Sequence, residues 1–405
     1  MTEQLIPSRR AFPADDPIFA LNAEAQAFKA AGGSVLNATV GALLDDAGQL
    51  VVLETVMDLW RELTALEVAP YAPIAGDPAF LKILVQRHWP QAAGAGAACA
   101  TPGGSGALGL SLRNFLERGQ SVLTTAPYWG PYATLAAENG VGVVTAPWPA
   151  AGEPLDAAAW DTALHTLMKT QGRVLLWLND PCHNPTGRSL SAADRVVLLG
   201  LLRDIAALGP VTLLLDFAYL DYAREPAAVA EALADYAALG AEGRVLVGGS
   251  MSLSKSMTLY GGRAGAIAFP WCSDPTLQAA LTQSCRGTWS NCAKAPQSLL
   301  LRLAREGKAQ VRLSSEHRHW SEVLASRALA LDAALEANGW DPLRWQGGFF
   351  VTVSTPESEA VCGRLKAEGV FTVPLREGLR VGLCGLRAAD APRFAETLRR
   401  VGSGR

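Results

Sequence analysis

The chain has 405 residues and a formal net charge of -3, with 35 Lys and Arg against 38 Asp and Glu. Hydrophobic residues make up 49% of it and charged residues only 18%. This composition excludes an intrinsically disordered chain and indicates that part of the surface is buried between the subunits of an oligomer. The near-neutral charge gives no reason to expect a nucleic acid or an anionic membrane as a partner.

The N-terminal residues lack the apolar core of a signal peptide, and no apolar run approaches the roughly 18 residues of a membrane span. We therefore expect a cytoplasmic protein that does not enter a membrane. The seven cysteines are odd in number and never spaced as CxxC, so we expect neither a disulfide framework nor a metal site. His317 and His319 would face different ways on a helix, which favours a solvated helix surface over a metal site.

The predicted elements fall into three segments. Residues 1–50 begin irregularly and contain prolines, so we expect them to pack on the small domain and on a partner subunit. Residues 51–310 are expected to form a large domain, because apolar runs alternate with helical stretches from about residue 97. This pattern is typical of an α/β fold, a mostly parallel sheet sandwiched by helices. Six runs are predicted strands buried on both faces: 121–125, 140–147, 173–179, 211–219, 243–250 and 265–270.

One helix of this domain has clear start and stop signals in its sequence. Ser191 is a candidate N-cap with Asp194 at the third helical position, and Gly209 is expected to close the helix. Residues 311–405 are expected to form a smaller α+β domain. It would begin with a long helix to about residue 337 and continue with strands near 345–354, 371–375 and 378–386 around a helix near 361–369.

A glycine-rich segment, TPGGSGALG, spells GxGxxG through Gly104, Gly106 and Gly109. A nicotinamide-binding fingerprint needs an acidic residue roughly 20 positions on, but no Asp or Glu lies between residues 117 and 138, and Pro102 interrupts the approach. A glycine-rich turn that opens a helix still exposes backbone N–H groups, so the segment suits a phosphate, with the Ser105 hydroxyl as a further donor. A simple tight turn is the alternative.

Polar residues follow three predicted strands. Lys255 lies just beyond an apolar strand among small residues, where a partly desolvated amine could form a Schiff base, although a surface lysine at a loop tip is the alternative. Asp216 follows five buried-type residues and needs a cationic or strongly donating partner, with Tyr219 three residues on. A capping role is the alternative there. Two prolines and a glycine hold Asn184 in a rigid turn, a position that suits ligand binding.

The order and spacing of these segments resemble the fold type I pyridoxal-phosphate enzymes, and within them the class I aminotransferases near the aspartate and aromatic aminotransferases. The resemblance extends over nearly the whole chain. Eight segments carry it in the order of the family: PYAPIAGDPAF (70–80), TPGGSGAL (101–108), PYWGPY (127–132), CHNPTG (182–187), DFAY (216–219), SLSKSMTLYGGR (252–263), RGTWSN (286–291) and GLRVGLCGL (378–386).

The resemblance implies that Lys255 holds pyridoxal phosphate as a Schiff base and shuttles the proton of the substrate Cα. It further implies that Asp216 pairs with the pyridine nitrogen, that Tyr219 and Asn184 bind the phenolic oxygen, and that Trp129 stacks on the ring.

The cofactor phosphate is, by the same resemblance, held by Gly104, Ser105, Gly106, Ser252 and Arg263.

The family's substrate residues imply a homodimer with shared active sites. Arg380 would bind the α-carboxylate of the substrate, and Gly41 would also contact the substrate. Tyr71 would reach the cofactor phosphate from the other subunit, and Arg286 would cross from that subunit to a distal carboxylate.

We therefore expect a pyridoxal-phosphate-dependent aminotransferase that acts on aromatic or dicarboxylic L-amino acids and 2-oxo acids by a ping-pong mechanism. A lyase or decarboxylase on the same fold, an NAD-dependent oxidoreductase and a non-catalytic effector-binding domain are the alternatives.

Overall fold

The structure is a computed structural model that describes residues 4–6, 17–376 and 378–402. The chain divides into two compact units. The large unit contains Leu50–Ala325 and Arg344–Phe349, and the small unit contains Met1–Gln49, Ser326–Leu343 and Phe350–Arg405. The division into domains 1–50, 51–310 and 311–405 stays a prediction, and residues 1–3 and 7–16 of its first segment lie outside the described residues.

The large unit is built on a mostly parallel sheet, as the sequence predicts. Among the described residues seven strands pair in the order β2-β8-β7-β6-β5-β3-β4; β8 runs antiparallel to both of its neighbours, and the other pairs are parallel. The strands are β2 (Ala97–Thr101), β3 (Ser121–Ala126), β4 (Gly142–Pro147), β5 (Val174–Leu178), β6 (Val211–Asp216), β7 (Leu246–Ser252) and β8 (Gly265–Phe269). The α/β architecture is confirmed.

Two strands differ from the prediction. β2 was not among the predicted strands, because its sequence AACAT carries few of the branched and aromatic side chains that favour strands. The expected burial of residues 140–147 on both faces is wrong, since β4 is half-exposed along most of its length. β4 lies at the edge of the sheet beside β3, so one side of it meets solvent.

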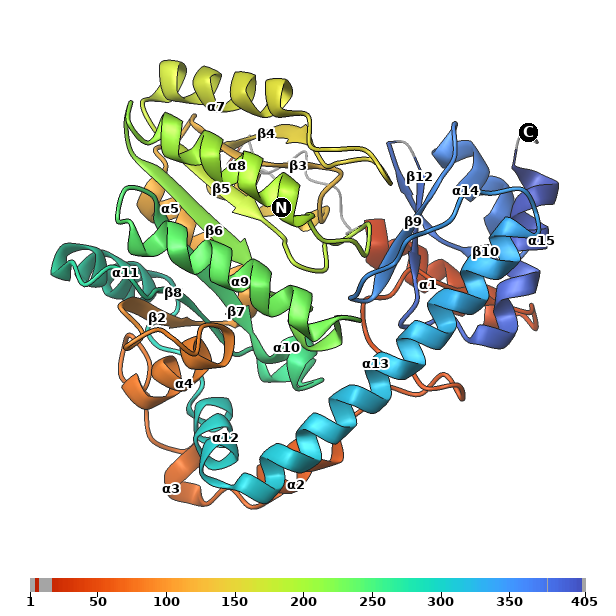
Figure 1. The fold of residues 1–405 in the computed structure, drawn as a ribbon. Helices are drawn as coiled ribbons and strands as arrows, with labels where there is room; N and C mark the ends of the chain where they lie inside the picture. Colours follow the sequence, from red (N-terminus) through yellow and green to blue (C-terminus); the bar gives the residue numbers. More distant parts are fainter. Residues whose placement is uncertain (1–3, 7–16, 377, 403–405) are drawn as a thin grey trace. The chain divides into compact units, whose positions relative to one another are not determined.

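Helices cover both faces of this sheet. In Figure 1, α8 and α9 lie in front of the strands and α5 lies behind them. The α-helices are α2 (Glu54–Arg61), α3 (Ala65–Val68), α4 (Pro78–His88), α5 (Gly103–Phe115), α6 (Pro131–Glu138), α7 (Ala157–Gln171), α8 (Ala192–Ile205), α9 (Pro226–Ala241), α10 (Leu253–Ser256), α11 (Pro275–Thr288), α12 (Lys294–Arg305) and the first part of α13 (Gly307–Glu336). Two 3₁₀ turns, η3 (Leu220–Tyr222) and η4 (Tyr260–Gly262), complete the unit.

Helix α8 begins as predicted but ends early. The Ser191 hydroxyl accepts a hydrogen bond from the Asp194 backbone N–H at 3.1 Å, and the Asp194 carboxylate accepts one from the Ser191 N–H at 3.3 Å. This reciprocal pair is a capping box. The expectation that Gly209 closes the helix is wrong, because the α-helix ends at Ile205. The following residues form tighter i→i−3 turns, with Leu208 N–H donating to the Ile205 carbonyl.

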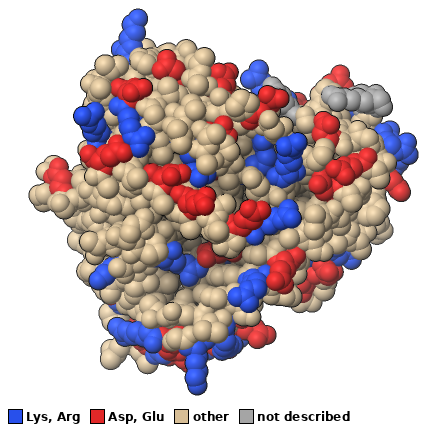
Figure 2. All heavy atoms as spheres, in the orientation of Figure 1, with Lys and Arg blue, Asp and Glu red and all other residues tan. Residues whose placement is uncertain are grey.

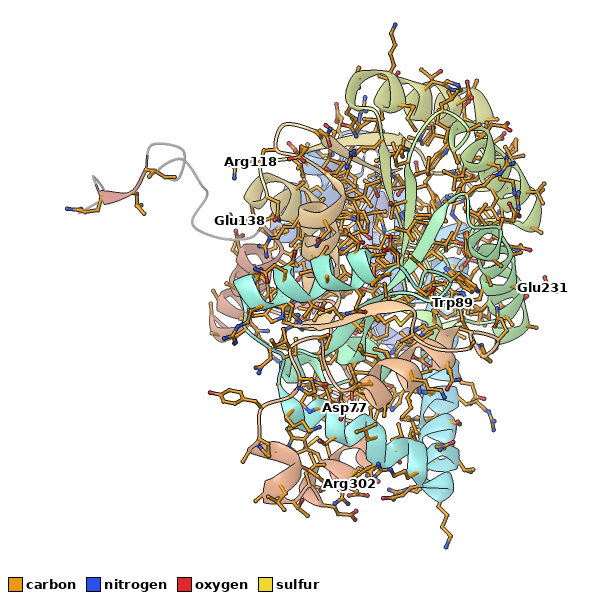
Figure 3. The ribbon with its side chains drawn as sticks, turned by 90° about the vertical axis from the view of Figure 1, so that its left-hand side faces the viewer. Asp77, Trp89, Arg118, Glu138, Glu231 and Arg302 are labelled. Carbon is orange, nitrogen blue, oxygen red and sulfur yellow. The ribbon has the colours of Figure 1, made fainter. Side chains whose placement is uncertain are left out.

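An aromatic cluster anchors the end of the central strand β6. Trp89 is completely buried, and its ring meets the edges of Phe217 and Trp271 at centroid distances of 5.0 Å each. In Figure 3 Trp89 lies within the body of the unit, whereas Glu231 lies at its outer rim. Since Phe217 directly follows Asp216, this packing fixes the backbone from which the Asp216 carboxylate projects.

The small unit is an α+β arrangement with two short sheets among its described residues. β1 pairs with β10 in parallel, and β12 lies between β11 and β9 in antiparallel pairing. Its elements are α1 (Pro17–Ala30), β1 (Leu36–Asn37), the end of α13, β9 (Phe350–Ser354), α14 (Ser358–Ala367), β10 (Val370–Phe371), β11 (Val373–Leu375), β12 (Gly378–Gly382), η5 (Ala388–Asp390) and α15 (Ala391–Val401).

Basic and acidic side chains are interspersed on the face drawn in Figure 2. This distribution accords with the near-neutral net charge of the chain. Within the described ranges, no helix combines the length and the apolar character needed to cross a bilayer.

Candidate active site

Three neighbouring parallel strands of the large unit have polar residues at their carboxyl-terminal ends. Asn179 follows β5, Asp216 ends β6 and Ser252 ends β7. The chain order changes direction here, because β3 pairs with β5 although β4 comes between them in sequence. Ligands of open α/β sheets bind beyond the carboxyl ends of the strands at such a switch point.

Asp216 is a buried carboxylate with a tyrosine as its donor. The Tyr132 hydroxyl donates to Asp216 Oδ2 at 2.8 Å, and both side chains are buried. Burial raises the pKa of Asp216 to about 6, while the Tyr132 hydrogen bond and the charge of Lys255 pull that pKa down. The carboxylate is therefore costly to ionise, and a ligand cation beside it would be strongly favoured.

Asn184 and Tyr219 lie together beside Asp216. Asn184 Nδ2 donates to the Tyr219 hydroxyl at 3.3 Å, and both side chains are buried. The Asn184 side-chain oxygen is also buried but has no hydrogen-bond partner among the described residues. A buried amide oxygen without a hydrogen bond costs free energy, so the Asn184 side chain is able to hydrogen-bond a ligand.

Lys255 lies on the short helix α10, directly after β7. Its Nζ is 5.2 Å from the centroid of the Tyr260 ring. Two buried side chains hold the backbone of α10: the Tyr222 hydroxyl donates to the Lys255 carbonyl at 3.1 Å, and His317 Nε2 donates to the Ser256 carbonyl at 2.5 Å. The predicted solvated surface is therefore wrong for His317, which α13 packs against α10.

A cradle for an anion lies at the start of α5. Arg263 Nη2 donates to the Pro102 carbonyl at 3.1 Å, and a Cβ added to Gly103 would lie 2.8 Å from this atom. Gly103 has a φ of 72°, so the backbone favours glycine there. The start of α5 is also close to the end of β7, since a Cβ at Gly104 would lie 3.8 Å from Ser252 Cβ, and the first N–H groups of a helix have no partner within it.

Ser105 and Gly106, also predicted, occupy the same first turn of α5 and are half-buried. Trp129 is half-buried before α6, with its ring 5.7 Å from that of Tyr132. The two residues expected to serve a neighbouring subunit lie on the surface. Tyr71 is 90% exposed, and Arg286 is exposed on α11 with Nη1 donating to Ser290 Oγ at 2.6 Å.

The predicted substrate residues of the small unit share an aromatic neighbour. Arg380 on β12 is buried, its guanidinium carbon lies 4.3 Å from the Phe350 ring centroid, and its Nη2 donates to the Thr39 carbonyl at 2.9 Å. A Cβ added to Gly41 would lie 3.2 Å from Cζ of the same ring. A side chain at Gly41 would thus press against Phe350.

A neutral histidine braces the loop that carries Asn184. The Thr125 hydroxyl donates to the Pro127 carbonyl and so accepts from His183 Nε2 at 3.0 Å, which leaves Nδ1 to accept from the Thr186 hydroxyl at 2.9 Å. Burial lowers the pKa of His183 to about 3, and its ring stacks on Trp148 at 3.9 Å. His183 is therefore a structural support that stays uncharged at neutral pH.

Sequence reasoning missed four residues of this region: Gly103, Tyr132, Asn179 and His183. A signal for two of them was present. Asn179 is a polar residue directly after an apolar strand, as Asp216 is, and Tyr132 lies three positions after Trp129, one helical turn away. Among the described residues no group of histidines, cysteines and carboxylates could hold a metal ion.

Comparison with known proteins identifies the family. Residues 34–398 match the family described as aminotransferase class I and II. The chain belongs to this family. The tyrosine aminotransferase of Rhizobium meliloti (strain 1021) is 27% identical to this chain over 405 residues, covering 94% of this chain and 96% of that protein. Other similar proteins are named aspartate and aromatic-amino-acid aminotransferases.

Solved structures agree with this assignment. An aminotransferase from Anaerococcus prevotii superposes with a TM-score of 0.91 at 28% identity, covering 99% of each chain. An aromatic-amino-acid aminotransferase from Burkholderia pseudomallei, covalently bound to pyridoxal phosphate, has a TM-score of 0.79 at 22% identity and covers 98% of this chain and 100% of that one. The chain is thus a member of a pyridoxal-phosphate-dependent aminotransferase family, and the nicotinamide interpretation of the glycine-rich segment is dropped.

The residues of the large unit fit this cofactor. The unsatisfied Asn184 oxygen marks an amide that can turn to a ligand oxygen, and the glycine cradle beside Arg263 leaves backbone N–H groups to receive a phosphate. Asp216 is a buried carboxylate, the kind of group that the protonated ring nitrogen of this cofactor needs as a partner.

Proposed function

We propose that the aminotransferase moves the amino group of an aromatic or dicarboxylic L-amino acid to a 2-oxo acid by a ping-pong cycle. The supporting observation is that Asp216, Asn184 and Tyr219 are buried near Lys255 at the carboxyl-terminal ends of the strands. The relatives named for tyrosine, aromatic amino acids and aspartate support these two substrate classes.

Each side chain around the cofactor has a separate task. Pyridoxal phosphate supplies an electron sink for the electron pair left at the substrate Cα when its proton departs. The Lys255 amine accepts that proton and later returns it, and the side chains that hold its backbone keep Nζ in reach. Asp216 holds the ring nitrogen in its protonated form, and the Tyr132 hydroxyl keeps this carboxylate ionised. Asn184 and Tyr219 bind the phenolic oxygen, and Trp129 covers the ring.

The phosphate is assigned to the cradle of the large unit. Arg263 supplies the charge, the first turn of α5 at Gly104, Ser105 and Gly106 supplies N–H groups, and Ser252 supplies a hydroxyl. These donors fix the cofactor at the end opposite its reactive carbon, so the ring cannot turn away from Lys255.

Arg380 is assigned to the α-carboxylate of the substrate. Its guanidinium is pre-oriented by the Phe350 ring and the Thr39 carbonyl, so little side-chain entropy is lost when a carboxylate binds. Gly41, which has no side chain to crowd the same ring, is assigned to contact with the substrate.

We further propose a homodimer whose two sites are shared. Tyr71 is 90% exposed although aromatic, and Leu66, Val68 and Ile74 on the same segment are also exposed. Such a stretch of apolar surface is typical of an interface. Tyr71 would reach the phosphate of the partner's cofactor, and Arg286 would supply the partner's site with a cation for a distal carboxylate.

Mixing two inactive variants tests the shared site. If Tyr71 and Lys255 act from different subunits, a hybrid dimer of Tyr71→Ala and Lys255→Ala chains contains one intact site. A random one-to-one mixture should then recover roughly a quarter of the wild-type activity. No recovery, in a mixture shown to contain hybrid dimers, would place both residues in one subunit's site.

Product analysis tests the reaction itself. With tyrosine, phenylalanine or aspartate as donor and a 2-oxo acid as acceptor, we expect equal amounts of the donor's oxo acid and the new amino acid. Release of ammonia or carbon dioxide in place of these products would replace the aminotransferase reaction by that of a lyase or decarboxylase on the same fold.

A further inference from the structure

Asn179 links two of the residues assigned above to the cofactor. Its Oδ1 accepts a hydrogen bond from the Asn184 backbone N–H at 2.6 Å, and its Nδ2 donates to the Asp216 backbone carbonyl at 2.7 Å. The three residues are all buried, with exposed fractions of 4% for Asn179, 3% for Asn184 and 7% for Asp216. One planar amide therefore connects the loop after β5 to the end of β6.

The position of this amide in the sheet explains its effect. The backbone pairing of β5 with β6 ends at Leu178 opposite Leu215, one residue before Asn179 and Asp216. On its other side, Asp216 remains paired with Ser250 of β7. The Asn179 side chain thus continues the link between β5 and β6 where the backbone ladder stops. Without the Asn179 side chain, the backbone of Asp216 would keep its pairing with β7 but lose this link to the β5 side.

We infer that Asn179 is a positioning residue that sets the spacing between Asp216 and Asn184. The inference rests on the proposed roles of these two residues. The carboxylate must meet the ring nitrogen of the cofactor while the amide meets its phenolic oxygen, and these two atoms are held at a fixed separation by the ring. Since both ends of the Asn179 amide are used, a change in either contact shifts one of the two groups relative to the other.

The contacts also account for the choice of residue. A side chain at this position must accept from one backbone group and donate to another, which an uncharged amide does and a carboxylate does not. Aspartate would keep the acceptor for the Asn184 N–H but would place a negative oxygen against the Asp216 carbonyl. Alanine would remove both contacts and leave two buried backbone groups without partners.

The test compares binding of pyridoxal phosphate by the full-length variants with hydrogen exchange of the Asn184 amide. We expect Asn179→Ala to weaken cofactor binding roughly tenfold, equivalent to about 1.4 kcal/mol, and to speed exchange at Asn184. Asn179→Asp should keep that amide protected yet still bind the cofactor more weakly. This second variant preserves the side-chain volume, so the inference can be tested even if the alanine variant fails to fold.

Gln171 supplies a matched control. Its side chain accepts from the Ser121 N–H at 2.8 Å and donates to the carbonyls of Ser121 at 3.0 Å and Arg173 at 3.1 Å, so it also holds backbone groups by both ends of its amide, at the amino-terminal end of β3. Gln171→Ala should leave cofactor affinity within twofold of the wild type. An equal loss in this variant would show that Asn179→Ala acts through general stability and would overturn the inference.

Two further variants separate this inference from the proposed function. Asp216→Asn and Asn184→Ala should each weaken cofactor binding if the site is assigned correctly. If they do and Asn179→Ala binds the cofactor normally, the positioning role is refuted and the site stands. If neither of them affects binding, the assignment of the site fails, and the role of Asn179 fails with it.

Discussion

Replacing Tyr132 with phenylalanine should raise the pKa of Asp216 without disturbing the packing around it. The variant loses one hydroxyl, which donates to Asp216 Oδ2 at 2.8 Å in a fully buried setting. A hydrogen bond to a charged group contributes ~1.5–3 kcal/mol, and one pKa unit corresponds to ~1.4 kcal/mol. The pKa of Asp216, already raised by burial to about 6, should therefore rise by roughly one to two further units.

This shift has a defined sign for stability. Because the folded-state pKa of Asp216 lies above its ordinary value of 3.8, its contribution favours folding at low pH and is lost as pH rises through the folded-state pKa. In the variant the loss continues to higher pH. The deficit in unfolding free energy of cofactor-free Tyr132→Phe should be small near pH 5 and should grow to ~1.5–3 kcal/mol above pH ~8. Denaturant titrations at several pH values measure it.

The same shift should appear in cofactor binding. Between pH ~6 and ~8 the variant should hold Asp216 partly protonated and bind pyridoxal phosphate more weakly than the wild type does. Tyr236→Phe is the control, because the Tyr236 hydroxyl also donates to a buried carboxylate, Asp180, whose pKa burial raises to about 6. That variant should lose similar stability while its cofactor binding keeps the wild-type pH dependence. A pH-independent deficit in Tyr132→Phe, or equal cofactor binding in the two variants, would refute the reasoning.

Three further predictions concern substrate and stability. Arg380→Gln should lower kcat/KM for every amino donor by ~30-fold or more, since a buried carboxylate partner is worth ~2–5 kcal/mol; a loss confined to one donor would contradict its assignment. Arg286→Leu should lower kcat/KM for aspartate roughly tenfold and leave phenylalanine within about twofold; equal losses in a steady-state comparison would remove it from the distal-carboxylate role. Ser191→Ala, which removes the cap of α8, should cost ~1 kcal/mol in denaturant unfolding at unchanged kcat, and any fall in kcat would show that α8 affects the site.

The sheet could be predicted from the sequence where its strands are buried and rich in branched residues. β5 and β6 carry such runs, and Asp216 stands out because a carboxylate ends one of them. β2 escaped prediction because its three alanines have little intrinsic preference for strands and take this conformation through pairing with β8. Burial of β4 was overestimated because an edge position depends on strand order, which periodicity does not reveal.

The site was predictable where a residue carries chemistry by its type, as Lys255 and Arg263 do. Residues that act through another residue were not. Tyr132, for example, matters because it lies within hydrogen-bond distance of a residue 84 positions away in the chain, and Asn179 matters through contacts made by both ends of its amide. Such contacts arise only when the strands are in register.

The most direct test of the central claim concerns Lys255. The purified enzyme, reduced with borohydride, should carry pyridoxal phosphate on the peptide that contains Lys255, as detected by mass spectrometry. Before reduction, addition of tyrosine or aspartate without an acceptor should convert the cofactor to pyridoxamine phosphate with one equivalent of the corresponding 2-oxo acid. Cofactor attached to another residue, or no conversion with any amino acid that binds, would contradict the account.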